Sequence, residues 1–239
     1  MLVSIIVPFR DEETTLPLLL ERADAAAMPA GMEREFILVD DDSGDSSHAA
    51  AAGFVARNPD RAQLITMPGH SGKGAAMRAG LTAAKGEIML VQDADLEWDP
   101  ADYLRLLSPY SDPGVSVVFG SRLLGSSEAI CIYPHYYVGG RLLSAFTNVL
   151  FGSRITDEPT GFKSFRRAAL DGITLAADGF DFDPEITGRL LQAGHTIHEV
   201  PVRYVPRTFR EGKKVRPWDG LRALWVLLLI RLEGRRRPA

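Results

Sequence analysis

The chain has 239 residues, of which 46% are hydrophobic and 24% are charged, the composition of an ordinary folded domain with a core of its own. The net charge of −4 gives no reason to expect nucleic acid as a partner. The single cysteine, Cys131, excludes an internal disulfide and fits a reducing compartment.

The first half of the chain alternates strand-like and helical segments. Short β-branched and apolar runs predict strands at 3–7, 36–39, 64–67, 87–92 and 115–119. Patterns typical of helices lie between them, at 15–27, 46–57 and 74–84. This alternation predicts an α/β fold with a mostly parallel sheet covered by helices.

The second half is less regular. Residues 123–155 include a run of aromatic and histidine side chains and a predicted helix at 140–150. A glycine-containing turn at 160–162, a helix at 183–193 and an alternating strand at 197–205 follow, and a final helix is predicted at 218–232.

The final segment is basic and amphipathic. From Arg207 onward there are ten Lys or Arg and three acids, so this segment carries +7 and the rest of the chain −11. On a helix, one face would carry Trp218, Leu221, Leu224, Trp225, Leu228 and Leu232. We expect this face either to lie on an anionic membrane surface or to pack on the domain or on a second copy of the chain.

No segment is expected to cross a bilayer. The longest apolar stretch, 224–230, is far shorter than the roughly 20 residues that a spanning helix needs. The apolar start at 2–7 is too short for a signal peptide and runs directly into Pro8 and acidic residues.

Polar clusters follow four of the predicted strands. They lie at 8–12, 40–45, 93–97 and 120–122. Ligands of open α/β sheets bind beyond the carboxyl ends of the strands, so these clusters predict an enzyme-like site at one edge of the sheet.

Asp93 and Asp95 stand two positions apart just after a predicted buried strand. Two carboxylates on one short turn can share a cation, and their oxygens suit Mg²⁺ or Mn²⁺, which usually also bind substrate phosphates. The alternative is a pair of acids that cap a turn or helix.

Two further motifs suit a nucleotide. The carboxylates of Asp40, Asp41 and Asp42 can accept hydrogen bonds from a base or ribose; the alternative is that Ser43 or Asp45 caps the next helix. The segment 69–74 fails the P-loop pattern, but its Lys73 precedes a helix start that favours anions.

Together these motifs resemble family 2 glycosyltransferases, the inverting enzymes with the GT-A fold. The matching segments are Ser4-Ile5-Ile6-Val7-Pro8, Val39-Asp40-Asp41-Asp42-Ser43-Gly44-Asp45, Gly72-Lys73-Gly74, Asp93-Ala94-Asp95-Leu96-Glu97 and Gly120-Ser121-Arg122. In the second half, 156–163, 179–185, 207–213 and the stretch from Arg141 to Ser144 resemble dolichol-phosphate mannosyltransferases and other polyprenyl-phosphate glycosyltransferases.

The resemblance implies a Rossmann-like, mostly parallel sheet flanked by helices, an acceptor-side loop and helix region and a C-terminal amphipathic helix. Residues 1–206 would form the catalytic domain, and residues 207–239 would form a basic, amphipathic segment that associates with a membrane. The implied reaction transfers a sugar, with inversion, from GDP-mannose or a UDP-hexose to a polyprenyl or dolichyl phosphate. The enzyme would be peripheral at the cytoplasmic face of the membrane.

The resemblance also implies roles for individual residues. Asp95 and Glu97 would bind the metal, Mg²⁺ or Mn²⁺. The nucleotide sugar would contact Pro8, Glu12, Asp40, Asp41, Lys73, Asp93, Ala94 and Asp95. The acceptor phosphate would meet Arg122, Arg141, Ser144, Arg207, Arg210 and Lys213, and the catalytic set would be Asp93, Asp95, Arg122 and Asp157.

The acceptor decides whether a base is needed. A phosphate monoester has a second pKa of about 6, so it is already a dianionic nucleophile and needs cations to bind it. A soluble or saccharide hydroxyl acceptor is the alternative, and it would need a general base. Asp157 and Glu185 are the candidates, unless Asp157 orients a basic side chain and Glu185 opens its helix. A nucleotide-binding module without activity is the third reading.

Overall fold

The computed structural model describes residues 1–125, 134–208 and 217–234. Its strands are β1 (Leu2–Phe9), β2 (Glu33–Asp40), β3 (Ala62–Thr66), β4 (Ile88–Val91), β5 (Val117–Ser121), β6 (Lys163–Arg166) and β7 (Ile197–Pro201). Its helices are α1 (Leu16–Ala25), α2 (Ser47–Arg57), α3 (Lys73–Ala83), α4 (Tyr103–Leu107), α5 (Pro134–Phe151), α6 (Phe182–Ala193) and α7 (Pro217–Glu233). Short 3₁₀ helices are η1 (Pro100–Asp102), η2 (Ser108–Ser111) and η3 (Arg167–Leu170).

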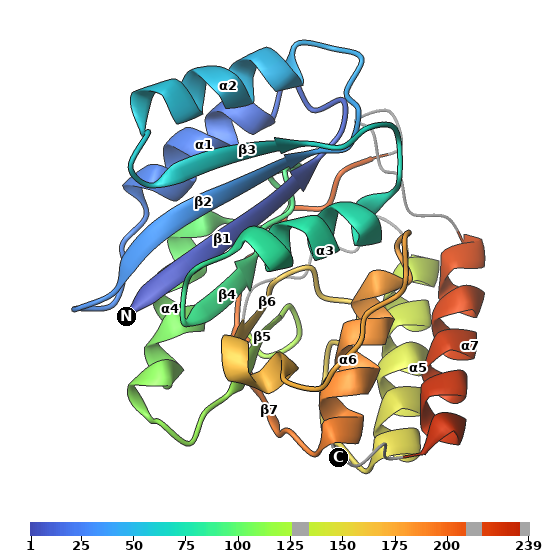
Figure 1. Ribbon diagram of the computed structural model, residues 1–239. Coiled ribbons are helices and arrows are strands. Elements are labelled where there is room, and N and C mark those ends of the chain that lie inside the picture. Colours follow the sequence, from blue (N-terminus) through green and yellow to red (C-terminus); the bar gives the residue numbers. More distant parts are fainter. Residues whose placement is uncertain (126–133, 209–216, 235–239) are drawn as a thin grey trace.

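The strands form one seven-stranded sheet in the order β3-β2-β1-β4-β6-β5-β7 (Figure 1). Neighbouring strands are parallel except around β6, which is antiparallel to both β4 and β5. The predicted fold class, a mostly parallel sheet flanked by helices, is confirmed.

Side chains of the central strands alternate between two cores. Ile5 and Leu38 face the core that α1, α2 and α4 cover, whereas Ile6 and Ile37 face the core that α3 and α6 cover. Both faces are therefore buried, which explains why these strands appear as unbroken apolar runs. Gly80 of α3 allows the close approach of this helix, because a Cβ there would lie 2.4 Å from Ile6 Cγ2.

Several elements differ from the sequence-based expectation. The strand β6 was not predicted, because its four residues begin with Lys163 and end with Arg166 and follow a turn. The strand predicted at 197–205 ends at Pro201, and α5 begins at Pro134, six residues before the predicted start.

The helices α5, α6 and α7 pack against one another beside the sheet (Figure 1). The buried side of α7 consists of Ala223, Leu227 and Ile230. Gly188 of α6 lies opposite, and a Cβ there would be 3.1 Å from both Leu227 and Ile230. Absence of a side chain at this position thus lets the two helices approach closely.

The opposite side of α7 is an exposed apolar stripe. It consists of Trp218, Leu221, Trp225, Leu229 and Leu232. Of the face predicted from the sequence, Leu224 and Leu228 are half-buried and the other four residues are exposed. Within the described ranges, no helix is long and apolar enough to cross a membrane.

Candidate active site

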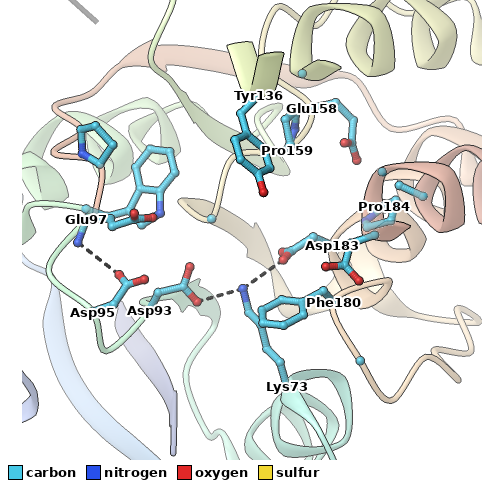
Figure 2. Close-up of a pocket in the computed structure, with 18 of the residues that line it drawn as sticks. Lys73, Asp93, Asp95, Glu97, Tyr136, Glu158, Pro159, Phe180, Asp183 and Pro184 are labelled. Atoms are coloured by element: carbon cyan, nitrogen blue, oxygen red, sulfur yellow. Dashed lines mark hydrogen bonds and ion pairs between the residues drawn. The ribbon is translucent and has the colours of Figure 1, made fainter. Parts of the chain in front are cut away.

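A cavity of about 1080 Å³ lies beyond the carboxyl ends of β1, β2, β4 and β5. Acidic side chains from the loop after β4 line one part of it, and residues of α5 and α7 line another. Figure 2 shows Asp93, Asp95 and Glu97 on one side of this space, with Lys73 below and Tyr136 of α5 pointing in from above. The polar strand ends therefore meet where the sequence predicts.

The acidic loop, which consists of residues 93–97 after β4, has a fixed shape. The Gln92 side chain accepts a hydrogen bond from Tyr103 Oη at 2.8 Å and donates to the carbonyl of Asp93. Leu96 has φ 60°, a turn conformation that is uncommon for leucine. The turn lets the Glu97 amide donate to Asp95 Oδ1 at 3.1 Å. Both carboxylates are thus held on one short loop.

Lys73 joins two acids that are far apart in the sequence. Its Nζ lies 2.9 Å from Asp93 Oδ1 and 2.9 Å from Asp183 Oδ2 (Figure 2). Burial opposes the charge of Lys73, but the two carboxylates outweigh it and raise the pKa of this lysine. Burial raises the pKa of Asp93 against the pull of Lys73, with Asp95 and Asp183 adding to the rise.

Arg207 contacts the acidic loop from the other side. Its Nη2 lies 2.9 Å from Asp95 Oδ2, its Nη1 lies 3.0 Å from Glu12 Oε2, and its backbone amide donates to Glu97 Oε1 at 2.6 Å. The sequence suggested that Arg207 would meet an acceptor phosphate, whereas its guanidinium pairs with Glu12 and with Asp95, one of the two predicted metal ligands.

The chemistry of this cluster fits a divalent cation. Three carboxylates gather around one positive group, and oxygen ligands of this kind suit Mg²⁺ or Mn²⁺. In the described part of the chain, no group of three or more His, Cys, Asp or Glu side chains already has the spacing of a metal site. Arg207 Nη2 already contacts Asp95 Oδ2, so an ion at that oxygen would compete with the guanidinium.

Arg122 and Asp157 form a second polar pair. Asp157 is 3% exposed and receives hydrogen bonds from the Arg122 amide at 2.9 Å, from Nε at 2.8 Å and from Nη2 at 2.6 Å. Burial alone would lower the pKa of Arg122, but the charge of Asp157 raises it. Asp157 thus holds a basic side chain, one of the two roles that the sequence left open.

Glu185 has a comparable structural task. Its carboxylate accepts hydrogen bonds from the amides of Ala176 and Ala177, at 3.0 and 2.8 Å. Asp157 and Glu185 were the two candidate bases for a hydroxyl acceptor. Both carboxylates are instead engaged in hydrogen bonds with other groups of the protein.

Asp40 and Asp41 fix the loops beside the cavity. Asp40 accepts from the Ser43 amide at 3.0 Å and lies 2.8 Å from His48 Nδ1. Asp41 accepts from the amides of Ser71 and Gly72 at 2.7 and 2.9 Å. Asp40 does not line the cavity; the other residues assigned to the nucleotide sugar do, namely Pro8, Glu12, Asp41, Lys73, Asp93, Ala94 and Asp95.

The residues assigned to the acceptor divide into three groups. Arg122, Arg141 and Arg207 line the cavity. Ser144 is buried, donates to the Gly140 carbonyl and accepts from the Glu158 amide. Arg210 and Lys213 lie outside the described residues.

Four residues that line the cavity were not among the predicted site residues. Asp183 completes the Lys73 bridge, and the rings of Trp98 and Tyr204 contact Arg122. Glu158 is fully buried, and the charge of Lys163 acts on its carboxyl. The available signals, an aromatic beside Glu97 and acids in a helix start, are too common to single them out.

The mostly parallel sheet, the acidic loop after β4 and the cavity at the strand ends define an α/β protein with an enzyme-like site. The model of the Glycosyl transferase family 2 matches residues 4–174, so the chain belongs to that family. The sequence-based identification is thereby confirmed.

Curated relatives are similar over most of this chain. A polyprenol monophosphomannose synthase from Mycolicibacterium smegmatis is 29% identical over 215 residues, covering 87% of this chain and 79% of the relative. An undecaprenyl-phosphate 4-deoxy-4-formamido-L-arabinose transferase from Pseudomonas fluorescens is 29% identical over 213 residues. The match covers 88% of this chain but only 59% of that relative's length.

Solved structures share the fold. Glucosyl-3-phosphoglycerate synthase from Mycobacterium tuberculosis, in complex with Mn²⁺, UDP and glucosyl-3-phosphoglycerate, has a TM-score of 0.67 at 20% identity and covers 99% of this chain and 81% of its own. A mannosyltransferase from Pyrobaculum calidifontis in complex with GDP-Man and Mn²⁺ has a TM-score of 0.65 at 20% identity. The match covers 99% of this chain and 65% of the mannosyltransferase chain.

Proposed function

We propose that this enzyme transfers a sugar from a nucleotide-diphosphate sugar to a polyprenyl phosphate, with inversion and with Mg²⁺ or Mn²⁺ as cofactor. In this reaction a phosphate oxygen of the acceptor forms a bond to the sugar C1. The bond from C1 to the diphosphate breaks, and its electron pair leaves with the nucleoside diphosphate. The names of the two curated relatives support the acceptor class.

The observation that carries the proposal is the pairing of Asp157 with Arg122. A hydroxyl acceptor needs a base, but Asp157 is committed to three hydrogen bonds from Arg122, and Glu185 to two backbone amides. A phosphate acceptor needs no base and needs cations instead. Arg122 and Arg141, which both line the cavity, would supply them.

The carboxylates of Asp95 and Glu97 would hold the metal. When bound, the ion would neutralise the diphosphate leaving group. Lys73 and Asp183 would orient groups of the donor near Asp93, because this bridge lies beside the acidic loop. GDP-mannose and UDP-hexoses are the proposed donors.

We further propose that residues 207–239 attach the 1–206 catalytic domain to the cytoplasmic face of an anionic membrane. The exposed stripe of α7 and the +7 charge of this segment support peripheral attachment. The acceptor would then be drawn from the same membrane.

A transfer assay tests the function. The purified chain is incubated with labelled GDP-mannose, UDP-glucose or UDP-galactose and with either undecaprenyl phosphate or soluble phosphoglycerate. Each reaction is run once with Mn²⁺ and once with a chelator. We expect label in the lipid with one of the donors when Mn²⁺ is present, and no transfer when the chelator is present. Transfer only to the soluble acceptor would favour the alternative glycosyltransferase, and donor binding without any transfer or hydrolysis would favour a binding module.

A further inference from the structure

The segment that follows β7 contacts both the acidic loop, at Glu97, and Arg122. Val202 hydrogen-bonds to the Ser121 carbonyl, and the Val205 amide donates to the Glu97 carbonyl at 2.9 Å. Between them, Tyr204 forms an isolated antiparallel bridge with Trp98. Hydrogen bonds of the backbone on both sides of Tyr204 therefore fix the position of its Cα atom.

The Tyr204 hydroxyl reaches the acidic loop. It donates to Glu97 Oε2 at 3.0 Å, while the Arg207 amide donates to Glu97 Oε1 at 2.6 Å. Each oxygen of Glu97 thus receives a donor from the same segment.

The Tyr204 ring lies against the guanidinium of Arg122. Cζ of Arg122 lies 4.8 Å from the centroid of this ring and 5.4 Å from that of Trp98, and the two ring centroids are 4.8 Å apart. A guanidinium against aromatic rings is stabilised electrostatically, and the rings also limit its movement. Asp157 holds the polar edge of the same guanidinium.

From this geometry we infer that Tyr204 is a positioning residue that holds Glu97 and Arg122 at a fixed separation. The inference rests on the proposed function, in which Glu97 serves the metal of the donor and Arg122 the phosphate of the acceptor. An inverting transfer needs the attacking oxygen in line with the leaving group, and a fixed frame supplies that alignment before the substrates bind.

Two substitutions separate the contacts of the Tyr204 hydroxyl from those of its ring. Tyr204→Phe removes the hydrogen bonds of the hydroxyl to Glu97 and Arg122 but keeps the ring beside the guanidinium, whereas Tyr204→Leu removes the ring as well. Tyr110→Phe is the matched control, because this buried tyrosine also loses one side-chain hydrogen bond, to Ser164 at 3.0 Å, in a different part of the fold. Thermal unfolding of all three variants records any loss of folding.

The first readout is Mn²⁺ binding by electron paramagnetic resonance in the presence of the nucleoside diphosphate of the active donor. For Tyr204→Phe we expect about a tenfold loss of Mn²⁺ affinity, and an acceptor KM that rises less than in Tyr204→Leu, because the ring and Asp157 still hold the guanidinium. For Tyr204→Leu we expect the same loss and a rise in acceptor KM of about fivefold. Tyr110→Phe should leave both quantities unchanged.

A double variant tests whether the effect passes through Glu97. Addition of Tyr204→Phe to Glu97→Gln should cause a much smaller further loss of Mn²⁺ affinity than Tyr204→Phe causes in the wild type, because the hydrogen bond from Tyr204 is already weakened. Wild-type affinity in Tyr204→Phe, or independent losses in the double variant, would overturn the inference while the proposed function stands. If the wild-type chain binds no Mn²⁺ with any nucleoside diphosphate, the metal-dependent function fails and the inference fails with it.

Discussion

Nη2 of Arg207 lies 2.9 Å from Oδ2 of Asp95, an ion pair between residues 112 positions apart. The same guanidinium pairs with Glu12, and only 14% of the Arg207 side chain is exposed. Burial alone would lower the pKa of Arg207, but the charges of Asp95 and Glu12 raise it. The arginine therefore remains positively charged, and it would compete with a metal ion for Asp95.

Replacement of Arg207 tests this competition. In Arg207→Gln we expect Mn²⁺ affinity in the absence of nucleotide to rise about five- to tenfold, because a charged hydrogen-bond donor no longer competes for Asp95. Calorimetric titration of Mn²⁺ measures it. Arg203→Gln is the control. This side chain is 60% exposed and forms a longer ion pair, 3.6 Å, with Asp99, so its loss should leave Mn²⁺ affinity unchanged. Weaker Mn²⁺ binding in Arg207→Gln would mean that Arg207 supports the metal site.

The role of Asp157 can be tested by kinetics. If Asp157 orients Arg122, Asp157→Asn should raise the acceptor KM about tenfold or more, because the charge-assisted hydrogen bonds to the guanidinium weaken. The dependence of kcat on pH should keep its shape, because no base is lost. Arg141→Ala should likewise weaken acceptor use more than donor binding. Loss of kcat without a change in acceptor KM, together with loss of its acidic limb, would identify Asp157 as a base. Asp171→Asn, at an exposed position, is the control.

The acidic loop illustrates how much of the site the sequence can predict. Asp93, Asp95 and Glu97 follow a short apolar strand, and the carboxyl ends of parallel strands meet at one edge, so their location is encoded locally. The Lys73–Asp183 contact joins residues 110 positions apart, and its existence depends on how α3 and α6 pack. No local pattern contains that information.

The strand β6 was missed for a related reason. Lys163 is fully buried within it because its ammonium group donates to the carbonyls of Glu158 and Thr160, at 3.2 and 2.6 Å. A lysine is almost never buried without such partners, so in sequence it indicates a surface turn. Likewise, the sequence marks the apolar positions of α7 but does not reveal which of them face α5 and α6.

Glu158 predicts a change of stability with pH. Burial raises the pKa of its carboxyl to about 7, although Lys163 lowers it; Asp183 and Asp157 add to the rise. The folded state therefore keeps the proton where the unfolded chain releases it. The stability that this proton provides is present below the unfolded pKa of about 4.5 and is lost as the pH rises through about 7.

Glu158→Gln removes this titration. We expect the wild type to lose up to about 3 kcal/mol of unfolding free energy relative to Glu158→Gln between pH 4.5 and 7. Urea unfolding at several pH values measures the difference, and Glu21→Gln, at an exposed position, is the control. A constant difference across this range would mean that Glu158 ionises normally.

The exposed stripe of α7 predicts docking on an anionic membrane. Trp218 is 76% exposed and Trp225 is 59% exposed, and both lie opposite the buried side of the helix. A double substitution, Trp218→Ser with Trp225→Ser, therefore removes apolar surface without disturbing the packing on α5 and α6. Each large side chain that enters an apolar phase contributes about 1.5–3 kcal/mol, so flotation with phosphatidylglycerol vesicles should fall more than tenfold.

Charge and control variants complete this test. Binding of the wild type should weaken with salt and with neutral phosphatidylcholine vesicles, because basic residues near an anionic leaflet contribute about 1 kcal/mol each. Leu18→Ser changes an exposed apolar residue of α1 and should leave flotation unchanged. If the wild type does not bind anionic vesicles at low salt, the docking proposal fails. If the double substitution instead converts a dimer into a monomer in sedimentation, the stripe is an interface between two copies of the chain. Retained lipid transfer in a variant that no longer floats would show that the acceptor reaches the cavity without membrane docking.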